Sequence, residues 1–262
     1  MTDTILLRED EAGIATLTMN APHKLNALSD AMLAALGSAF TALAEDRAVR
    51  VIVLRGAGRA FCAGHDLREM QAARAAADRG AGYFADLFAR FAAVAEMIPR
   101  LPQPVIAEVQ GIATAAGCQL VATCDMAVAA EDARLGVNGV NIGLFCSTPM
   151  VALTRNVSRK AAFEMLTTGA FISAARAAEL GLVNRVVAPA ELGAATRVLA
   201  ATVAAKLGAA VRIGKRAFYE QAEMTRAEAY AHTARVMAEN MLWRDTEEGI
   251  GAFLEKRPPN WG

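Results

Sequence analysis

The chain has 262 residues, 55% of them hydrophobic, and its 27 Lys and Arg residues balance 27 Asp and Glu residues to give a net charge of zero. Proteins that bind nucleic acid or anionic membranes usually carry a basic excess or a basic patch, so this balance argues against both partners. No apolar run approaches the roughly 18 residues that cross a bilayer. The length fits one large domain, or one domain with an appendage.

The cysteine pattern argues against a metal site. Cys62, Cys118, Cys124 and Cys146 form no C-x-x-C pair, and the chain has only three histidines. Zinc sites need closely spaced Cys and His ligands, so we expect no metal. The first residues carry no basic segment followed by an apolar run, as a secretory signal would. The sequence therefore predicts a cytoplasmic chain with reduced thiols.

Strands and helices alternate in the first part of the chain. Strands are predicted at residues 14–19, 50–54, 105–109 and 126–130, and helices directly after Ser29, at 82–98 and at 119–123. Ser29 suits the N-cap of the first helix, and Pro99 is expected to end the second. This alternation predicts a mostly parallel, layered α/β core.

The last part of the chain is predicted to be helical. A short helix at 173–180 ends at Gly181, a residue that readily adopts the left-handed conformation at a helix C-terminus. After Val187, helices are predicted at 189–206, 209–220, 225–240 and 245–256. We therefore expect a core over residues 1–190 and a helical region over 191–262.

Two glycine-containing loops, residues 56–64 and 111–117, follow predicted strands. Ligands of parallel α/β folds bind at the carboxyl ends of the strands. Glycine and alanine let backbone N–H groups approach a ligand closely, and the second loop leads into a short helix whose N-terminus favours negative charge. These loops are candidates for holding an oxyanion, although ordinary strand-to-helix turns have a similar composition.

Motifs along nearly the whole chain resemble the crotonase family, also called the enoyl-CoA hydratase/isomerase family. They are residues 23–28 (HKLNAL), 61–70 (FCAGHDLREM), 104–111 (PVIAEVQG), 117–120 (GCQL), 124–125 (CD), 166–169 (LTTG), 172–174 (ISA), 178–183 (AELGLV) and 253–257 (FLEKR). Residues 143–149 (GLFCSTP) resemble a divergent branch of this family.

The resemblance implies a crotonase spiral of β-β-α units, in which residues 191–262 form a trimerisation region. It implies a homotrimer or a dimer of trimers, and a coenzyme A thioester as substrate with no permanently bound cofactor. The activity it implies is that of a lyase of the enoyl-CoA hydratase type in fatty acid metabolism.

Site residues follow from the same resemblance. The backbone N–H groups of His65 and Ala116 would form an oxyanion hole for the thioester. Coenzyme A would lie along Lys24, Leu25, Ala63, Asp66 and Leu67. Lys256 would approach the coenzyme A phosphates, from the same or a neighbouring subunit.

Two positions depart from the family pattern. A hydratase of this family carries Glu at the positions of Gln119 and Gly139, where one activates water and the pair delivers the α-proton. A carboxamide has no useful pKa, and glycine has no side chain. Losing a positioned acid or base lowers a rate by about 10²–10⁴. We therefore expect thioester binding and oxyanion stabilisation, with hydration limited at these positions and raised when both become Glu.

Several alternatives stay open. A decarboxylase needs an enolate stabiliser but no base, a thioester hydrolase uses the same oxyanion hole, and a non-catalytic acyl-CoA-binding protein needs neither acid nor base. The His65 imidazole is the leading candidate to move a proton, because an unperturbed histidine has a pKa of about 6.5. The alternative is that the ring only packs and the His65 backbone alone acts.

Other residues near these motifs have two interpretations. Asn138 and Asn141 flank Gly139 and are candidates for polar contacts with a ligand, or for turn geometry. Cys118 and Cys146 either border an acyl pocket or pack as small buried residues. Four further residues fit either an acyl cavity or helical core packing: Phe84, Leu87, Phe88 and Phe91.

Overall fold

The computed structural model describes residues 4–261. The chain divides into two compact units, Met1–Val203 and Ala204–Gly262. All strands that the described residues form lie in the first unit, and the second unit is helical.

A six-stranded sheet is the centre of the first unit, with strand order β1-β2-β3-β4-β6-β9. Its strands are β1 (Leu6–Glu11), β2 (Ile14–Met19), β3 (Val51–Gly56), β4 (Val105–Val109), β6 (Met126–Ala130) and β9 (Arg185–Val187). β1 pairs antiparallel with β2, and the other pairings are parallel. The four predicted strands are confirmed as β2, β3, β4 and β6.

Strand β1 was not predicted, because its sequence LLREDE is mostly charged and shows no apolar alternation. It lies at the edge of the sheet with five of its six residues exposed. Charged side chains on an edge strand discourage pairing with another chain.

A second, three-stranded sheet has the order β5-β7-β8. Its strands are β5 (Ile112–Thr114), β7 (Arg134–Gly136) and β8 (Ile172–Ser173). β5 pairs parallel with β7, which pairs antiparallel with β8. β5 lies inside the segment predicted as a loop, so the second glycine segment is a strand, a sharp turn and a helix.

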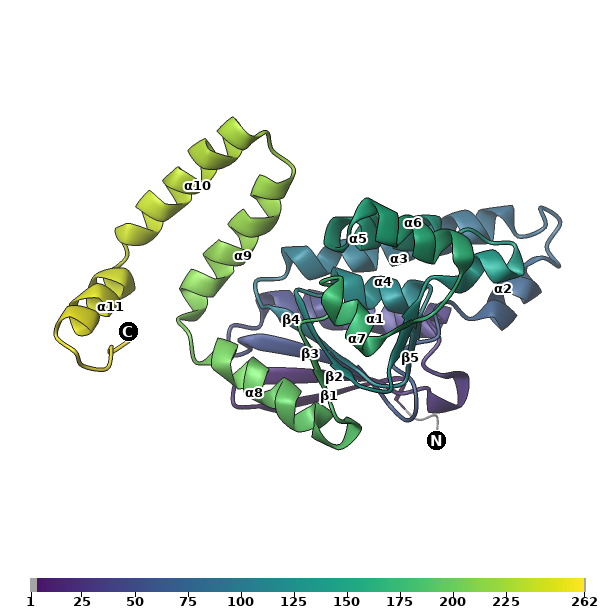
Figure 1. Ribbon diagram of the computed structural model, residues 1–262, viewed down its shortest axis with the longest axis horizontal. Coiled ribbons are helices and arrows are strands. Elements are labelled where there is room, and N and C mark those ends of the chain that lie inside the picture. Colours follow the sequence, from purple (N-terminus) through teal and green to yellow (C-terminus); the bar gives the residue numbers. More distant parts are fainter. Residues whose placement is uncertain (1–3, 262) are drawn as a thin grey trace. The chain divides into compact units, whose positions relative to one another are not determined.

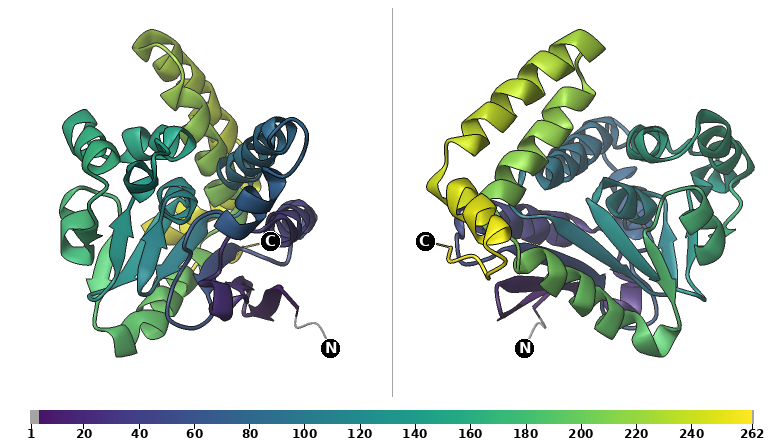
Figure 2. Two further views of the ribbon diagram at one scale, coloured as in Figure 1. Left: turned by 90° about the vertical axis from the view of Figure 1, so that its right-hand side faces the viewer. Right: turned by 60° about the vertical axis from the view of Figure 1, so that its left-hand side comes forward.

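Helices cover both faces of the strands (Figures 1 and 2). In these views α3 and α4 lie on one side, and α8 runs along the other. The helices are α1 (Asp30–Glu45), α2 (Leu67–Ala73), α3 (Ala81–Arg100), α4 (Ala116–Thr123), α5 (Ser147–Asn156), α6 (Arg159–Thr168), α7 (Ala174–Glu179) and α8 (Leu192–Ala204). Ser29 caps α1 as predicted by accepting a hydrogen bond from the Met32 N–H at 3.3 Å, whereas α3 continues one residue past Pro99.

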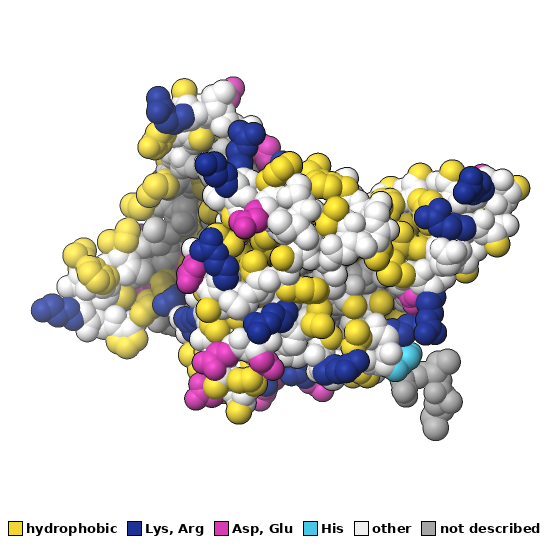
Figure 3. Space-filling view, turned by 45° about the vertical axis from the view of Figure 1, so that its right-hand side comes forward, with side chains coloured by type: hydrophobic (Ala, Val, Ile, Leu, Met, Phe, Trp, Pro, Cys, Tyr) yellow, Lys and Arg dark blue, Asp and Glu magenta, His cyan; other side chains and the backbone are white. Residues whose placement is uncertain are grey.

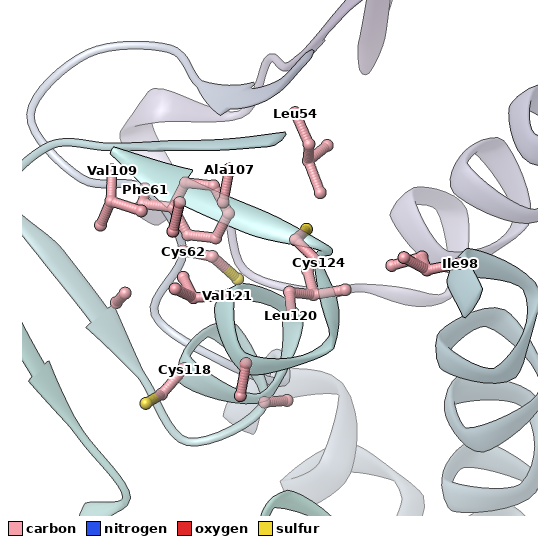
Figure 4. Close-up of a cluster of buried hydrophobic side chains, with 14 of the residues drawn as sticks. Leu54, Phe61, Cys62, Ile98, Ala107, Val109, Cys118, Leu120, Val121 and Cys124 are labelled. Atoms are coloured by element: carbon pink, nitrogen blue, oxygen red, sulfur yellow. The ribbon is translucent and has the colours of Figure 1, made fainter. Parts of the chain in front are cut away.

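Helix α4 is the most deeply buried element of this unit, because its residues from Ala116 to Ala122 are all buried. Figure 4 shows Leu120, Val121 and Cys124 beside Ala107 of the neighbouring strand, and Cys118 on another side of the helix. A helix fixed on all sides by close packing holds its N-terminus in one position. That N-terminus begins at the second glycine segment.

The division between the two units falls after Val203, whereas the sequence suggested a boundary after residue 190. Helix α8 belongs to the first unit because it packs there. Leu192, Thr196 and Leu199 are buried, and Arg197 forms an ion pair with Glu11 of β1. The second unit comprises α9 (Gly208–Ala222), α10 (Arg226–Met241) and α11 (Arg244–Leu254).

Within residues 4–261, no single helix is long and apolar enough to cross a membrane, although the consecutive helical segments 189–204 and 208–222 pass that test together by length and composition. Over the same residues, no group of three or more His, Cys, Asp or Glu side chains is placed to hold a metal ion.

Candidate functional site

Backbone hydrogen bonds join the two glycine segments of the first unit. The Cys62 N–H donates to the Ile112 carbonyl at 3.1 Å, and the Thr114 N–H donates to the Cys62 carbonyl at 3.0 Å. Gly117 packs against the same residue, because a Cβ atom there would lie only 2.2 Å from the Cys62 carbonyl oxygen. The absence of a side chain at Gly117 therefore allows α4 to approach the first loop.

Gly64 lies against the turn that precedes α4. Its φ of +89° is one that L side chains rarely adopt, and a Cβ there would lie 3.1 Å from the Thr114 carbonyl oxygen and 3.4 Å from the Ala116 nitrogen. His65 directly follows Gly64. The structure thus brings the two predicted donor residues, His65 and Ala116, onto neighbouring backbone segments.

The N–H groups of His65 and Ala116 have no internal acceptor: within residues 4–261, neither donates a backbone hydrogen bond. Ala116 is the first residue of α4, where N–H groups have no partner inside the helix and carry partial positive charge. The preceding residue, Ala115, has φ 49° and ψ −118°, a strained conformation of the kind that persists where surrounding structure enforces it. Two preorganised, uncommitted donors on touching loops are what an oxyanion hole requires.

Gln119 lies one turn after Ala116 on α4 and is only 5% exposed. Its Oε1 atom is buried and has no hydrogen-bond partner among residues 4–261. An unpaired polar atom in a protein interior costs about 1–3 kcal/mol. The structure therefore keeps an unsatisfied neutral amide where the family resemblance implies a carboxylate.

Gly139 lies in a short 3-10 helix, η2 (Asn138–Ile142). A Cβ at this position would lie 2.3 Å from the Leu144 carbonyl oxygen and 2.8 Å from the Cys146 sulfur. The expectation that glutamates at both positions would raise hydration stays a prediction, and at Gly139 it meets an obstacle, since backbone and a thiol already occupy the place of a side chain.

The asparagines that flank Gly139 hold the local backbone. The Thr114 hydroxyl donates to Asn138 Oδ1 at 2.6 Å, and Asn141 Nδ2 donates to the Gly169 carbonyl at 3.3 Å. These contacts favour the turn-geometry interpretation of both residues. The bond to Asn138 also ties η2 to β5, next to the turn that leads into α4.

The His65 ring packs edge-on against two phenylalanines of α3. The ring centroids lie 5.6 Å from Phe88 and 5.1 Å from Phe91. Burial lowers the pKa of His65 to about 4, although the nearby Leu28 backbone opposes this shift. Apart from the nearby Leu28 backbone, neither imidazole nitrogen has a hydrogen-bond partner within the described residues. At neutral pH the ring is therefore uncharged and a weak base, which favours the packing interpretation over proton transfer.

The residues expected along coenzyme A in the first unit come from two adjoining segments, residues 24–25 and 63–67. Lys24 Nζ donates to Asp66 Oδ2 at 2.9 Å, and the Ala63 N–H donates to the Leu25 carbonyl at 3.0 Å. Burial alone would raise the pKa of Asp66, but the Lys24 ammonium and backbone N–H donors hold it below its ordinary value. Leu67 begins α2 and is 53% exposed.

Lys256 lies in the second unit, directly after the residue that caps α11. Its backbone has a φ of +55°, and its N–H donates to the Phe253 carbonyl at 3.2 Å. A role of Lys256 at the coenzyme A phosphates stays a prediction.

Asn26 holds the first loop together, a role that the sequence did not reveal. It is fully buried with φ +53°, a conformation that Asn tolerates better than most residues. Its Oδ1 accepts from the Ala21 N–H at 3.0 Å, and its Nδ2 donates to the carbonyls of Ala57 and Ala60 at 2.9 and 2.8 Å. The HKLNAL motif was the only available signal, and it did not distinguish Asn26 from its neighbours.

The buried thiols near the site are poor nucleophiles. Burial raises the pKa of Cys62 and of Cys118 to about 12, so less than a thousandth of either is thiolate at pH 8. We expect iodoacetamide at pH 8 to leave both cysteines unmodified in the folded protein and to alkylate them in urea, as followed by mass spectrometry of peptides. Rapid labelling of Cys62 in the native protein would contradict this assignment.

The parallel core and the paired backbone donors define a protein of the crotonase class, and comparison with known proteins agrees. The sequence model of the enoyl-CoA hydratase/isomerase family matches residues 9–262, so the chain belongs to this family. A crystal structure of an enoyl-CoA hydratase from Mycobacterium smegmatis matches with a TM-score of 0.95 at 56% identity, covering 99% of each chain.

The resemblance of the chain to a divergent branch of the family is confirmed. Human mitochondrial enoyl-CoA hydratase domain-containing protein 3 is 44% identical over 249 residues, which cover 95% of this chain and 80% of the human protein. The crystal structure of the human protein matches with a TM-score of 0.93 at 42% identity, covering 98% of this chain and 100% of that one.

The predicted cytoplasmic location is contradicted by these relatives. The frog, human and mouse members of the branch are all named as mitochondrial proteins. The prediction rested on reduced cysteines and on the lack of a secretory pattern, and neither property distinguishes the cytoplasm from other reducing compartments.

Proposed function

We propose that this chain is an acyl-CoA-acting enzyme that polarises a thioester between the backbone N–H groups of His65 and Ala116. The observation that carries this proposal is the contact at Gly64, which places two uncommitted donors on adjoining segments. A thioester oxygen that gains negative charge in an enolate would be stabilised by both donors. The names of the relatives, which include probable enoyl-CoA hydratases, support the same substrate class.

Polarisation, rather than fast hydration, is the chemistry that these residues support. Gln119 is no base, the side-chain position at Gly139 is filled, and the His65 imidazole is neutral with a pKa of about 4. Decarboxylation or thioester hydrolysis would need fewer protein acids and bases than hydration. Non-catalytic binding of acyl-CoA is the second candidate, and the filled position beside Gly139 is the observation that favours it.

Assembly as a homotrimer or a dimer of trimers, through the helical C-terminal region, is part of this proposal. It is supported by large apolar side chains of the second unit that are exposed. Phe218, Tyr230, Leu242 and Phe253 are 64, 73, 87 and 81% exposed, and Figure 3 shows apolar side chains on much of the visible surface. Extended apolar surface of this kind marks interaction sites.

A chromophoric thioester tests the oxyanion hole directly. The absorbance of dimethylaminocinnamoyl-CoA shifts to the red when hydrogen bonds polarise its carbonyl, so we expect a red shift on binding to the purified protein. Gly64→Ala should abolish most of this shift, because its Cβ would push against Thr114 and Ala116 at a backbone φ of +89°. Difference absorbance spectra at saturating protein measure the effect.

A matched control is Gly214→Ala in α9, where an added Cβ meets no atom within 4 Å. This variant should keep the full shift. Tight binding of the probe to the unmodified protein without any shift would contradict the proposed oxyanion hole. An unchanged shift in folded Gly64→Ala would contradict the part assigned to this contact.

A further inference from the structure

We propose that the His65 imidazole and the Gln119 carboxamide together form an uncharged hydrogen-bonding subsite that selects acyl groups with a hydroxyl or keto oxygen near the thioester and disfavours a carboxylate there. This inference rests on the proposed function, since it concerns the acyl group whose thioester the two backbone donors hold. It assigns specificity to two side chains rather than proton transfer to either.

The first observation is that the two residues lie next to the paired donors along the backbone. His65 supplies one of these N–H groups from its own backbone. Gln119 lies three residues after Ala116, so the two residues share a face of α4. Because a Cβ at Gly64 would lie only 3.4 Å from the Ala116 nitrogen, both side chains begin within one helical turn of the same backbone contact.

The second observation is that, within residues 4–261, the fold leaves buried polar atoms of both side chains under-satisfied: Oε1 of Gln119 has no partner, and the His65 imidazole has only the nearby Leu28 backbone. Buried side-chain polar atoms nearly always find hydrogen bonds in native proteins. When such atoms lie beside a proposed ligand-binding loop, we expect the ligand to supply the missing hydrogen bonds.

Another glutamine shows why Gln119 is different. Gln110 also has a buried Oε1 without a partner within residues 4–261, but its Nε2 atom donates to the backbone carbonyl of Gly56 at 2.5 Å. That amide is fixed by the fold. Among the described residues no backbone carbonyl holds the Gln119 amide in this way, so its hydrogen-bonding capacity is available to a ligand.

The charge of the surroundings determines what the subsite accepts. Arg90 is the charged group that acts on the His65 ring, and it is already paired with Asp30 at 2.8 Å and with Asp86 at 2.5 Å. A carboxylate buried beside a neutral imidazole and a carboxamide would therefore lack a dedicated counter-ion, which is strongly unfavourable. A neutral imidazole and a carboxamide both supply a donor and an acceptor, so they match a hydroxyl or a keto oxygen.

Binding measurements on the full chain test this subsite. Butyryl-CoA, 3-hydroxybutyryl-CoA, acetoacetyl-CoA and malonyl-CoA would be compared by isothermal titration calorimetry. We expect 3-hydroxybutyryl-CoA or acetoacetyl-CoA to bind about tenfold more tightly than butyryl-CoA, as one or two neutral hydrogen bonds would give. Malonyl-CoA should bind more weakly than butyryl-CoA.

Two shape-matched variants assign the preference to its residues. His65→Phe keeps an aromatic ring against Phe88 and Phe91, and Gln119→Met keeps the length of the side chain. Each should reduce the tenfold preference to about threefold or less. The readout is the ratio of the affinity for the oxygenated thioester to the affinity for butyryl-CoA, measured in the same variant. A general loss of affinity leaves this ratio unchanged. Gln221→Met, on α9 in the second unit, is the control and should keep the ratio; if His65→Phe fails to fold, Gln119→Met carries the test.

The outcomes separate the subsite from the proposed function. If butyryl-CoA does not bind the unmodified protein, the proposed function fails and the subsite fails with it. If butyryl-CoA binds and the oxygenated thioesters bind no more tightly, or malonyl-CoA binds best, only the subsite is overturned. A preference that persists in both variants would also overturn it.

Discussion

Replacing Gly139 with glutamate is expected to destabilise the protein by about 3 kcal/mol or more, without raising hydration of crotonyl-CoA. Its Cβ would lie 2.3 Å from the Leu144 carbonyl oxygen and 2.8 Å from the Cys146 sulfur, and overpacking a buried site typically costs 1–3 kcal/mol before a carboxylate is added. In a chain of this size, that loss corresponds to a melting temperature lower by about 6–12 °C. Differential scanning calorimetry measures it.

Gly37→Ala is the matched control for that loss. Gly37 lies inside α1, where an added Cβ would meet only Val94 Cγ2, at an ordinary 3.6 Å. Alanine is favoured over glycine in a helix by about 0.5–1 kcal/mol, so this variant should melt at the same or a higher temperature. The prediction is contradicted if Gly139→Glu melts at the same temperature as the unmodified protein. Residues 144–146 would then move aside easily and leave room for a side chain at residue 139.

Replacing Gln119 with glutamate is expected to raise crotonyl-CoA hydration by about 100-fold, the lower end of what one positioned base supplies. Gln119 and Glu have nearly the same shape, and the buried Oε1 has no partner that the change would break. Burial raises the pKa of a carboxyl group, because it disfavours the charged form. The base is the ionised form, so the rate should increase with pH until that raised pKa is passed.

Gln119→Met is the control that distinguishes the effect of a new carboxylate base from the effect of any change of side chain at residue 119. It is equally long but supplies neither charge nor a strong acceptor, so hydration should stay at the unmodified level or below it. Steady-state rates from pH 5 to 9 distinguish the two variants. A folded Gln119→Glu protein that hydrates crotonyl-CoA no faster than Gln119→Met would show that a single carboxylate here does not limit the reaction.

The sequence predicted the central layer of the fold because buried parallel strands are apolar in nearly every residue. Strands β3, β4 and β6 have this pattern, β2 was predicted from its alternating, β-branched sequence, and Ser29 marked the start of α1. It did not predict β1, whose residues are mostly charged, or β5, which has three residues in a glycine-rich segment. Short or solvated strands are formed by pairing with distant segments, and local sequence patterns do not record that pairing.

The candidate site was predictable to a different extent. Glycine loops and family motifs pointed to His65 and Ala116, because backbone donors need small residues near them. The state of the His65 ring was not predictable, since its pKa depends on burial against Phe88 and Phe91, which lie more than 20 residues away in sequence. The closure of the Gly139 position was equally hidden, because it depends on where the Leu144 carbonyl points in three dimensions.

The contact between Gly139 and the Leu144–Cys146 segment also constrains how this protein could change over evolutionary time. A glutamate side chain at residue 139 would overlap the Leu144 carbonyl oxygen and the Cys146 sulfur. The substitution alone would therefore lower the stability of the protein, and selection would act against it even if it improved catalysis. A second carboxylate at residue 139 would first require the neighbouring segment to change shape. Changes in residues 144–146 would therefore have to precede a glutamate at residue 139, which constrains the order of mutations.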